Sequence, residues 1–499
     1  MTEKKTLIFL LIILAIAAFF RLWQLDSIPP GLYPDVAING NDALDSLKNG
    51  DFKVFYPENN GREGLFIWLI AASFSIFGVS IWSIKIVAAI IGILTVFGLY
   101  LLTNELFKNA EKCSRHIALL ASFFLAISFW HVNFSRIGFR AILLPFILVF
   151  AFYFLFRGFR TQKLPNFIIS GIFFGLGFYT YISYRFIVLL LPLILICWWL
   201  IYKKQNLQKQ FLYSIFYILI SIFIVALPIG FYFLQNPQDF ISRATGISIF
   251  ATENPIKEFG KSLILHLGMF NFYGDPNWRH NFAGSPMLLW PVGILFLIGL
   301  FYSLYRLYKS AKIPSLHSSR IFSIFGFLIS WFFIMLLPGI LTYEGIPHAL
   351  RVIGVIPVVY IFAGLGGWKV YQWLDKNVKG KKLLLFAVLF FLFTVGFLQF
   401  DKYFIKWANR PEVADAFSRD YVQIGNYLNS LPSEIPKYVI VNVSGVPASY
   451  PDGIPMPAQT IMFIESIKYG QPQATYLLPE NLDQIKIEEN AVAVKMRYE

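Results

Sequence analysis

Charge and cysteine are both scarce in this sequence. Charged residues make up 14% of the 499 residues, whereas about 25% is usual in soluble proteins. The two cysteines, Cys113 and Cys197, fall in a predicted loop and in a predicted apolar span, which leaves no disulfide framework. The sequence also lacks internal repeats, low-complexity tracts, and glycine-rich nucleotide-binding loops of the Walker or dinucleotide type.

Apolar side chains are abundant instead. They account for 57% of the chain and include 54 phenylalanines. They occur in long blocks, which is typical of lipid-facing helices and not of one large core. This composition excludes a disordered chain, a collagen and a cytosolic enzyme. The net charge of +14 does not indicate nucleic-acid binding, because the basic residues gather in loops on one side of a membrane.

The apolar blocks predict a polytopic α-helical membrane protein with about eleven transmembrane helices. The predicted spans cover residues 6–23, 80–106, 116–133, 141–156, 166–182, 186–202, 211–234, 288–305, 320–342, 351–371 and 382–400. Residues 64–78 are also apolar, but this stretch is short and another span follows at once. We therefore predict that it forms a helix that lies in the interface or re-enters the membrane.

The basic residues favour one orientation of these spans. Lys4, Lys5 and the loops after the even-numbered spans are rich in Lys and Arg, whereas the short loops on the other side hold only Arg136, Arg140, Arg185 and Arg351. The first span stays apolar through Trp23, which favours an uncleaved anchor over a signal peptide. We expect a multi-pass protein of the cell (plasma) membrane with a cytoplasmic N-terminus and an extracytoplasmic C-terminus.

Three segments are predicted to lie outside the membrane: a first loop (24–79), a long loop (235–287) and a C-terminal stretch (401–499). The C-terminal stretch alternates predicted helices over 418–431 and 458–468 with predicted strands over 438–443 and 491–495. We therefore predict a transmembrane domain over residues 1–400 and a small extracytoplasmic α/β domain over residues 401–499.

Charged residues near the sparsely charged ends of the spans are candidates for function, because charge is costly at membrane depth. Carboxylates dominate the first loop and cations dominate the later loops, which predicts a base that faces an anion-binding site. Pro29, Pro30, Gly31 and Pro34 predict an irregular entry into a helix, with Asp35 as its N-cap. Capping is thus the structural alternative to a catalytic role for Asp35.

Several motifs occur in a recognisable order: Arg21 at the end of the first span, the Pro29-Pro30-Gly31 turn, Asp35, the segment 60–66 (NGREGLF), and the segment 135–140 (SRIGFR). Together they resemble the glycosyltransferase family 39 branch of the GT-C superfamily, which includes protein O-mannosyltransferases and lipid A aminoarabinose transferases. The resemblance covers roughly residues 6–400.

The resemblance implies a GT-C fold and the transfer, with inversion, of a hexosyl or pentosyl unit from a polyisoprenyl-phosphate donor. The acceptor would be a hydroxyl of a protein, lipid or glycan of the cell envelope, on the extracytoplasmic face. Asp35 matches the catalytic position, but Val36 follows where the family usually has Glu. Either that Glu is dispensable here, or Asp42, Glu58 or Glu63 takes part of its role, or activity is lost.

In such a reaction a carboxylate accepts the proton of the hydroxyl, and arginines stabilise the phosphate leaving group. The candidate phosphate ligands are Arg136, Arg140, Arg279, His280, His348 and Arg351, of which His348 and Arg351 would share a helical face. The secondary candidates are Arg62, Tyr181, Arg185 and Arg243. Snorkelling to lipid headgroups, turn formation and interfacial anchoring are the structural alternatives.

His131 and His266 stand alone in apolar stretches, and no group of His, Cys and Asp has metal-ligand spacing. We therefore predict no cofactor, and a divalent cation is left open. The competing functional class is a multi-pass transporter or flippase for lipid or glycan, which would also use many spans and intramembrane charge. Repeated halves with broken helices, which are frequent in transporters, are not visible here. The third alternative is an inactive scaffold.

Overall fold

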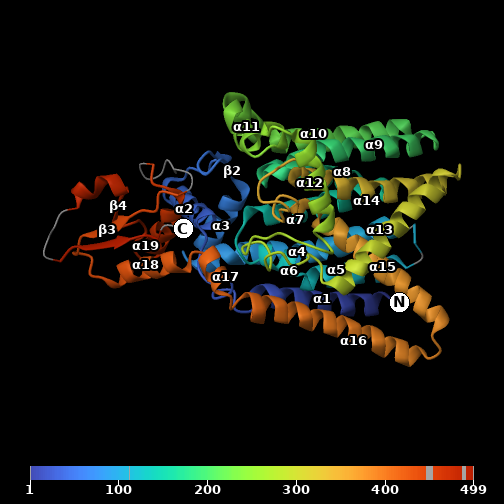
Figure 1. Ribbon diagram of the computed structural model, residues 1–499. Helices are drawn as coiled ribbons and strands as arrows, with labels where there is room; N and C mark the ends of the chain where they lie inside the picture. The colour runs from blue at the N-terminus through green and yellow to red at the C-terminus, as the bar shows by residue number, and fades with distance from the viewer. Residues whose placement is uncertain (1, 109, 112, 445–452, 486–489, 498–499) are drawn as a thin grey trace.

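The computed structural model describes residues 2–108, 110–111, 113–444, 453–485 and 490–497. The helices of a large bundle run side by side in nearly one direction, and the N-terminus lies at one end of this bundle (Figure 1). Each predicted span coincides with one of them: α1 (Glu3–Leu22), α4 (Ile81–Phe107), α5 (Ser114–Ile127), α7 (Leu143–Thr161), α8 (Leu164–Leu176), α9 (Ile187–Lys203), α10 (Gln208–Gln235), α13 (Trp290–Ala311), α14 (Leu316–Ile340), α15 (Ile356–Asn377) and α16 (Lys381–Phe400). The polytopic α-helical class is confirmed.

Within the described residues, nine helices are long and apolar enough to cross a membrane. The two shorter ones are α5 and α8, yet both are integral to the bundle: α5 packs against α4 and α15, and α8 against α7 and α10. The count of eleven crossings therefore stays a prediction.

The predicted span 116–133 is not one continuous helix. It breaks at Ser128, which has extended dihedral angles (φ −61°, ψ 121°), and resumes as the short helix α6 (Phe129–Phe134). Arg21, which is fully buried, donates to the carbonyl oxygen of Ala126 (2.8 Å) and contacts His131 Nδ1 (2.7 Å). The arginine at the end of the first helix thus satisfies a carbonyl that the break would leave without a partner.

The first loop folds into α2 (Pro34–Asn49), a short antiparallel pair of strands β1 (Phe55–Tyr56) and β2 (Arg62–Glu63), and α3 (Leu65–Phe77). Helix α3 packs against α2 and α4 and belongs to the end of the bundle that carries α2 (Figure 1). Its last residues, Ile76 and Phe77, are exposed apolar side chains. This arrangement suits the predicted interfacial helix.

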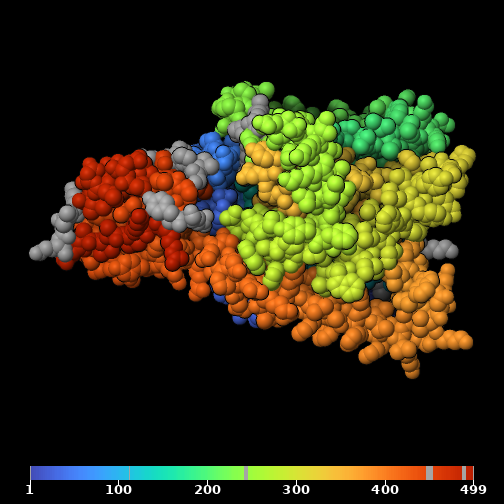
Figure 2. All heavy atoms as spheres, in the orientation of Figure 1, coloured from blue at the N-terminus to red at the C-terminus, as the bar shows by residue number. Residues whose placement is uncertain are grey.

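The long loop 235–287 has more regular structure than the sequence predicted. It contains α11 (Pro237–Gly246), a 3-10 turn (Ile249–Ala251) and α12 (Pro255–Gly268). Residues 269–289 then return to the bundle without helix or strand. In Figure 2, yellow-green atoms of the long loop cover part of the face of the bundle that is in view.

The C-terminal stretch forms a small α/β unit, as predicted. Strands β3 (Lys437–Ile440), β4 (Thr475–Leu477) and β5 (Val492–Lys495) make a parallel sheet in the order β4-β3-β5, with α18 (Arg419–Ser430) and α19 (Gln459–Tyr469) packed on each other. The sequence did not predict β4. A π-helical turn (Asp401–Trp407) and α17 (Pro411–Ala416) connect the unit to α16.

Helix α19 of the C-terminal unit packs directly on α2 of the first loop (Figure 1). Asn41 donates to the side chain of Gln459 (2.8 Å), and Thr460 donates to the carbonyl of Leu32 (2.9 Å). At Gly40 a Cβ atom would come within 2.7 Å of the Phe463 ring, so only glycine permits this approach. The contact supports the helix that carries Asp35.

Candidate active site

Asp35 is the second residue of α2 and not its N-cap. The helix begins at Pro34, and the N-cap is Tyr33, whose side chain makes no capping hydrogen bond. Proline favours this first position because its φ is preset and its missing N–H is not needed there. The prediction that Asp35 caps the helix is therefore wrong. Its half-buried carboxylate forms no hydrogen bond or ion pair with any described residue.

Asp35 lines a pocket of about 340 Å³ at the α2 end of the bundle. The other lining residues are Asn39, Phe139, Arg140, Ala141, Tyr181 and Leu350. They come from α2, from the turn before α7, from the turn before α9 and from the loop before α15. The fold thus brings together three residues that the sequence analysis selected separately: Asp35, Arg140 and Tyr181.

Arg140 is the cation that lines this pocket. Its Nε donates to Glu63 (3.0 Å) and its Nη2 donates to the carbonyl of Gly61 (3.1 Å), while the guanidinium lies 5.5 Å from the centre of the Tyr181 ring. Glu63 is therefore bound to Arg140 and compensates part of its charge. The ion pair also ties the strand β2 to the turn before α7.

Val36 occupies the position where the resembling family usually has Glu. It is 1% exposed and belongs to the main apolar core. A Cβ atom at Gly138 would lie 2.9 Å from Val36 and 3.3 Å from Ile84, which shows how closely these residues pack. A carboxylate at position 36 would be buried in this apolar contact, so a second acid cannot serve the pocket from here.

The other acids of the first loop surround Arg62. This fully buried guanidinium contacts Asp42 (2.5 Å) and Glu58 (3.6 Å) and donates to Asn39 Oδ1 (3.0 Å). Burial raises the pKa of Asp42, and the charge of Arg62 opposes this shift. Asp42 and Glu58 are thus partners of a buried arginine and do not line the pocket that contains Asp35.

Arg279 approaches the same region from the loop 269–289. Its guanidinium stacks over Tyr33, 4.0 Å from the ring centre, and the Tyr33 ring in turn contacts Phe139 of the pocket. In the part of the chain that the structure describes, the Arg279 side chain has no hydrogen-bonding partner, and its Nε is buried. A planar guanidinium with free donors is suited to bind a phosphate.

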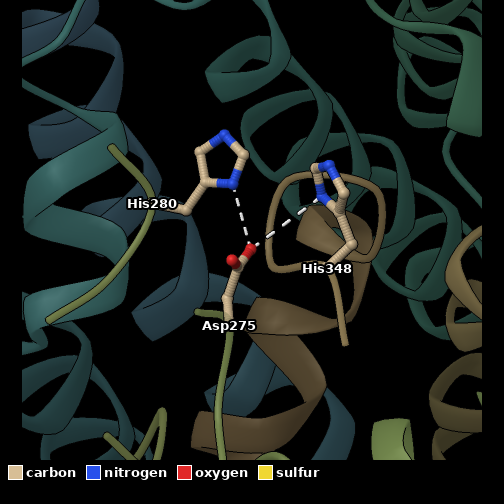
Figure 3. Close-up of side chains that lie close together, drawn as sticks. All are labelled: Asp275, His280 and His348. Carbon is tan, nitrogen blue, oxygen red and sulfur yellow. Dashed lines mark hydrogen bonds and ion pairs between the residues drawn. The ribbon is translucent and has the colours of Figure 1, made fainter. Parts of the chain in front are cut away.

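Three further side chains meet beside the pocket: Asp275, His280 and His348 (Figure 3). His280 Nδ1–H donates to Asp275 Oδ2 (3.0 Å), which also accepts the N–H of Ala349 (2.7 Å). His348 Nδ1 lies 3.9 Å from the same oxygen. Sequence reasoning selected both histidines but gave no role to Asp275. Its position in a Gly-Asp-Pro-Asn turn, five residues before His280, was the available signal.

These three residues could also hold a divalent cation. One ligand atom from each lies within 4.8 Å of the others, and one carboxylate with two imidazoles is a donor set that suits Zn²⁺. A cation bound here would replace the proton that His280 now shares with Asp275. The expectation of no cofactor therefore remains a prediction, and so does the divalent cation left open beside it.

His266 supports this cluster from α12, although the sequence marked it as isolated. Its Nδ1–H donates to the carbonyl of Ser262 (2.8 Å), and its Nε2 accepts the N–H of His348 (3.2 Å). Burial lowers the pKa of His266 to about 4. The neutral imidazole that these contacts require is therefore favoured, and it fixes the backbone on which His348 is mounted.

The remaining predicted cations do not line the pocket. Arg136 is fully buried and donates to the carbonyls of four residues that follow or end α1: Phe20, Trp23, Gln24 and Ile28. Arg136 therefore holds the loop after α1, and its role as a phosphate ligand stays a prediction. Arg185 similarly donates to the carbonyl of Phe240 and stacks on that ring at 4.0 Å.

Arg351 donates to Thr342 Oγ1 (2.9 Å) and to the carbonyl of Glu344 (2.6 Å). Residues 348–352 form turns, and α15 begins only at Ile356. The expected helical face shared by His348 and Arg351 is therefore wrong, although the Arg351 N–H does contact His348 Nδ1 (3.4 Å). Arg243 belongs to α11, but its side chain is outside the described part of the structure.

Comparison with known proteins identifies the fold. The chain has the GT-C fold of membrane glycosyltransferases. The structure of ArnT from Cupriavidus metallidurans bound to undecaprenyl phosphate aligns with a TM-score of 0.54 and 12% identity over 96% of this chain and 91% of that chain. The apo state of the same protein gives a TM-score of 0.55 and 12% identity over 95% and 85% of the two chains.

A second structure with the same fold is the Archaeoglobus fulgidus oligosaccharyltransferase tethered with an acceptor peptide. It aligns with a TM-score of 0.54 and 15% identity over 93% of this chain, which spans 63% of that enzyme. The model of the family described as dolichyl-phosphate-mannose-protein mannosyltransferase matches residues 65–229, about a third of the chain. The comparison with curated proteins gives no match.

Proposed function

We propose that this protein is a membrane glycosyltransferase that moves a sugar from a polyisoprenyl phosphate to a hydroxyl group of a protein, lipid or glycan. The observation that carries the proposal is the carboxylate of Asp35: it has no partner among the described residues, yet it lines a pocket beside Arg140. The GT-C fold and the undecaprenyl phosphate bound to ArnT support a lipid-phosphate donor.

In the proposed reaction, the carboxylate of Asp35 accepts the proton of the acceptor hydroxyl. At the same time, the oxygen of that hydroxyl bonds to the anomeric carbon of the sugar. The bond between that carbon and the phosphate oxygen breaks, and the configuration inverts. The polyisoprenyl phosphate leaves with the bonding electron pair. A carboxylate that no cation neutralises is available as a general base, whereas Asp42 and Glu58 are already engaged by Arg62.

Arg279 is the residue best suited to the leaving phosphate. Its guanidinium has no hydrogen-bonding partner among the described residues and lies over the ring of Tyr33, two residues before Asp35. Arg140 contributes less net charge because Glu63 is bound to it. Donors fixed in advance around a growing negative charge stabilise the transition state. His280 and His348 lie next to this region and extend it toward the 269–289 loop.

The proposed orientation places the pocket and the C-terminal unit on the extracytoplasmic side. The opposite end of the bundle carries the basic loops that the positive-inside rule assigns to the cytoplasm, and the N-terminus lies there (Figure 1). Cysteine labelling at position 205, in the loop after α9, and at position 434, in the C-terminal unit, should react from opposite sides. Labelling of both from one side would contradict this topology.

The central test is Asp35→Asn in purified protein reconstituted with a panel of polyprenyl-phosphate sugars, with release of polyprenyl phosphate as the readout. Loss of a positioned general base should slow turnover by about 10²–10⁴-fold. The unfolding temperature should not change, because the carboxylate neither caps α2 nor forms an ion pair. Asp51→Asn is the matched control, since its side chain lies just after the end of α2 and is 66% exposed.

Near-normal turnover by Asp35→Asn would remove Asp35 from the mechanism. If the unmodified protein releases polyprenyl phosphate from none of the donors but moves a lipid-linked sugar across the bilayer, the transporter alternative would be favoured. If the protein neither releases polyprenyl phosphate nor moves the lipid-linked sugar, the scaffold alternative would be favoured.

A further inference from the structure

A second pocket lies at the end of the bundle opposite Asp35. It is lined by the last turns of α4 and α7, by α9 and by the first turns of α14, and it is open to the outside; its empty space, the open part included, is about 590 Å³. Its polar lining residues are Glu105, Arg160, Trp198 and Arg320, and Phe156 and Ile324 are among its apolar walls. The proposed glycosyl transfer uses none of these residues.

The polar atoms of this pocket include two donors that no described residue satisfies. Trp198 is 8% exposed, and its Nε1–H is buried without a partner among the described residues; the same holds for the Nε–H of Arg320. The Nη2 group of Arg320 donates only to Gln205 (3.3 Å). Unsatisfied buried donors are uncommon in proteins, so each calls for an acceptor.

The carboxylate of Glu105 does not supply that acceptor. Arg160 binds both of its oxygens through Nε and Nη2. The acid and one arginine thus compensate each other, and Arg320 is left as the positive charge of the pocket without a carboxylate partner in the described residues. The missing ligand should therefore be an anion.

The surroundings of Trp198 favour an anion that carries hydrocarbon. Ile196 and Leu200, which flank it on α9, are exposed apolar side chains, as expected for a lipid-facing helix. Basic residues such as Lys203 and Lys204 follow at the end of the same helix. A tryptophan and an arginine at this depth correspond to the headgroup level of a bilayer.

We infer that this pocket binds the phosphate headgroup of one anionic phospholipid of the surrounding leaflet. Arg320 Nε–H and Trp198 Nε1–H donate to the phosphate oxygens, and an acyl chain follows the wall formed by Phe156 and Ile324. The occupied site joins α4, α7, α9 and α14. This inference is independent of the proposed transferase activity.

Native mass spectrometry of the delipidated full-length protein provides the test. Phosphatidylglycerol should bind with one high-affinity site, and phosphatidylcholine should bind more weakly. Arg320→Gln should weaken that first site about tenfold or more, since a charge-assisted contact is lost, and Trp198→Phe should weaken it less. Lys376→Gln is the matched control, because Lys376 is an exposed cation in the last turn of α15, at the same end of the bundle.

Equal losses in Arg320→Gln and Lys376→Gln would show diffuse electrostatic attraction and overturn the site. Unchanged phosphatidylglycerol affinity in both Arg320→Gln and Trp198→Phe would overturn it as well. The last measurement is competition between inorganic phosphate and phosphatidylglycerol. If inorganic phosphate displaces phosphatidylglycerol at comparable concentration, the ligand is a free anion and the lipid assignment is wrong. Equal unfolding temperatures of all variants in phosphatidylcholine nanodiscs exclude misfolding as the cause.

Discussion

Two carboxylates of α2 have opposite surroundings: Asp35 in the first turn of the helix and Asp42 two turns later. Asp35 and Asp42 are seven residues apart and so lie on nearly the same face of the helix. Arg62 binds Asp42 at 2.5 Å, whereas Asp35 has no partner among the described residues. The neighbouring cation of Asp35, Arg140, is already held by Glu63. One helix thus carries an acid bound by a buried arginine and an acid without a partner among the described residues, and the placement of two arginines makes the difference.

The largest expected effect concerns the structural acid. Arg62→Met should lower the free energy of unfolding by about 3–5 kcal/mol, because it leaves Asp42 buried without its counter-charge. Thermal unfolding in detergent measures this. The double variant Arg62→Met, Asp42→Asn should recover much of the loss. If Arg62→Met is as stable as the unmodified protein, the contrast between the two acids does not depend on Arg62.

The second prediction concerns Arg279, the cation that stacks over Tyr33, two residues before Asp35. Arg279→Ala should lower the rate of donor use by about 10–100-fold, the effect of losing a charge-assisted contact, with little change in stability, since the side chain has no hydrogen-bonding partner in the described residues. Arg279→Lys should recover the rate of donor use only in part, because lysine lacks the planar guanidinium that can donate two parallel hydrogen bonds to a phosphate.

Arg185→Ala is the comparison for Arg279, since Arg185 binds the carbonyl of Phe240 and does not line the pocket. Its rate of donor use should stay within a few-fold of normal in the same assay. If the Arg185 variant is slow and the Arg279 variant is normal, the phosphate lies elsewhere.

The third prediction is a pH dependence of the free energy of unfolding that originates from His266. The pKa of this residue is about 4 in the folded protein and about 6.5 when unfolded. Between these values the unfolded state binds more protons, so stability is lost as the pH falls from about 6.5 to 4, with a slope of at most about 1.4 kcal/mol per pH unit.

His266→Gln should remove that contribution from the pH profile of unfolding. The other histidines remain in both proteins, so the difference between the two profiles isolates His266. Identical profiles would mean that His266 does not hold the His348 backbone as a neutral imidazole.

The sequence allowed the helices to be predicted because apolar blocks and their lengths determine membrane spans locally. Each predicted span matches a helix, and the elements of the C-terminal unit follow their predicted order. The start of α2 was also predictable: a proline at position 34 favours the first helical position, which makes Tyr33 the cap. The helix break at Ser128 could not be predicted from the sequence, because Arg21 stabilises it from another helix.

The partners of the arginines could not be predicted from the sequence. Arg136 and Arg140 are four residues apart and share the same apolar context, but Gly138 between them has a φ of +77°. The chain turns there, so that Arg136 reaches the carbonyls after α1 and Arg140 reaches the pocket. Which cation faces a site depends on such tertiary contacts, as the pairing of Glu63 with Arg140 also illustrates.

The packing of α19 on α2 also has a consequence for the order in which the protein matures. Asn41 and Gln459 are 418 residues apart, and a ribosome makes the first long before the second. The face of α2 that packs on α19 therefore has no cover until the chain has been made through residues 459–469. A nascent chain that already contains Asp35 and every bundle helix still lacks the contact that supports α2, so this packing forms only after α19 has been made.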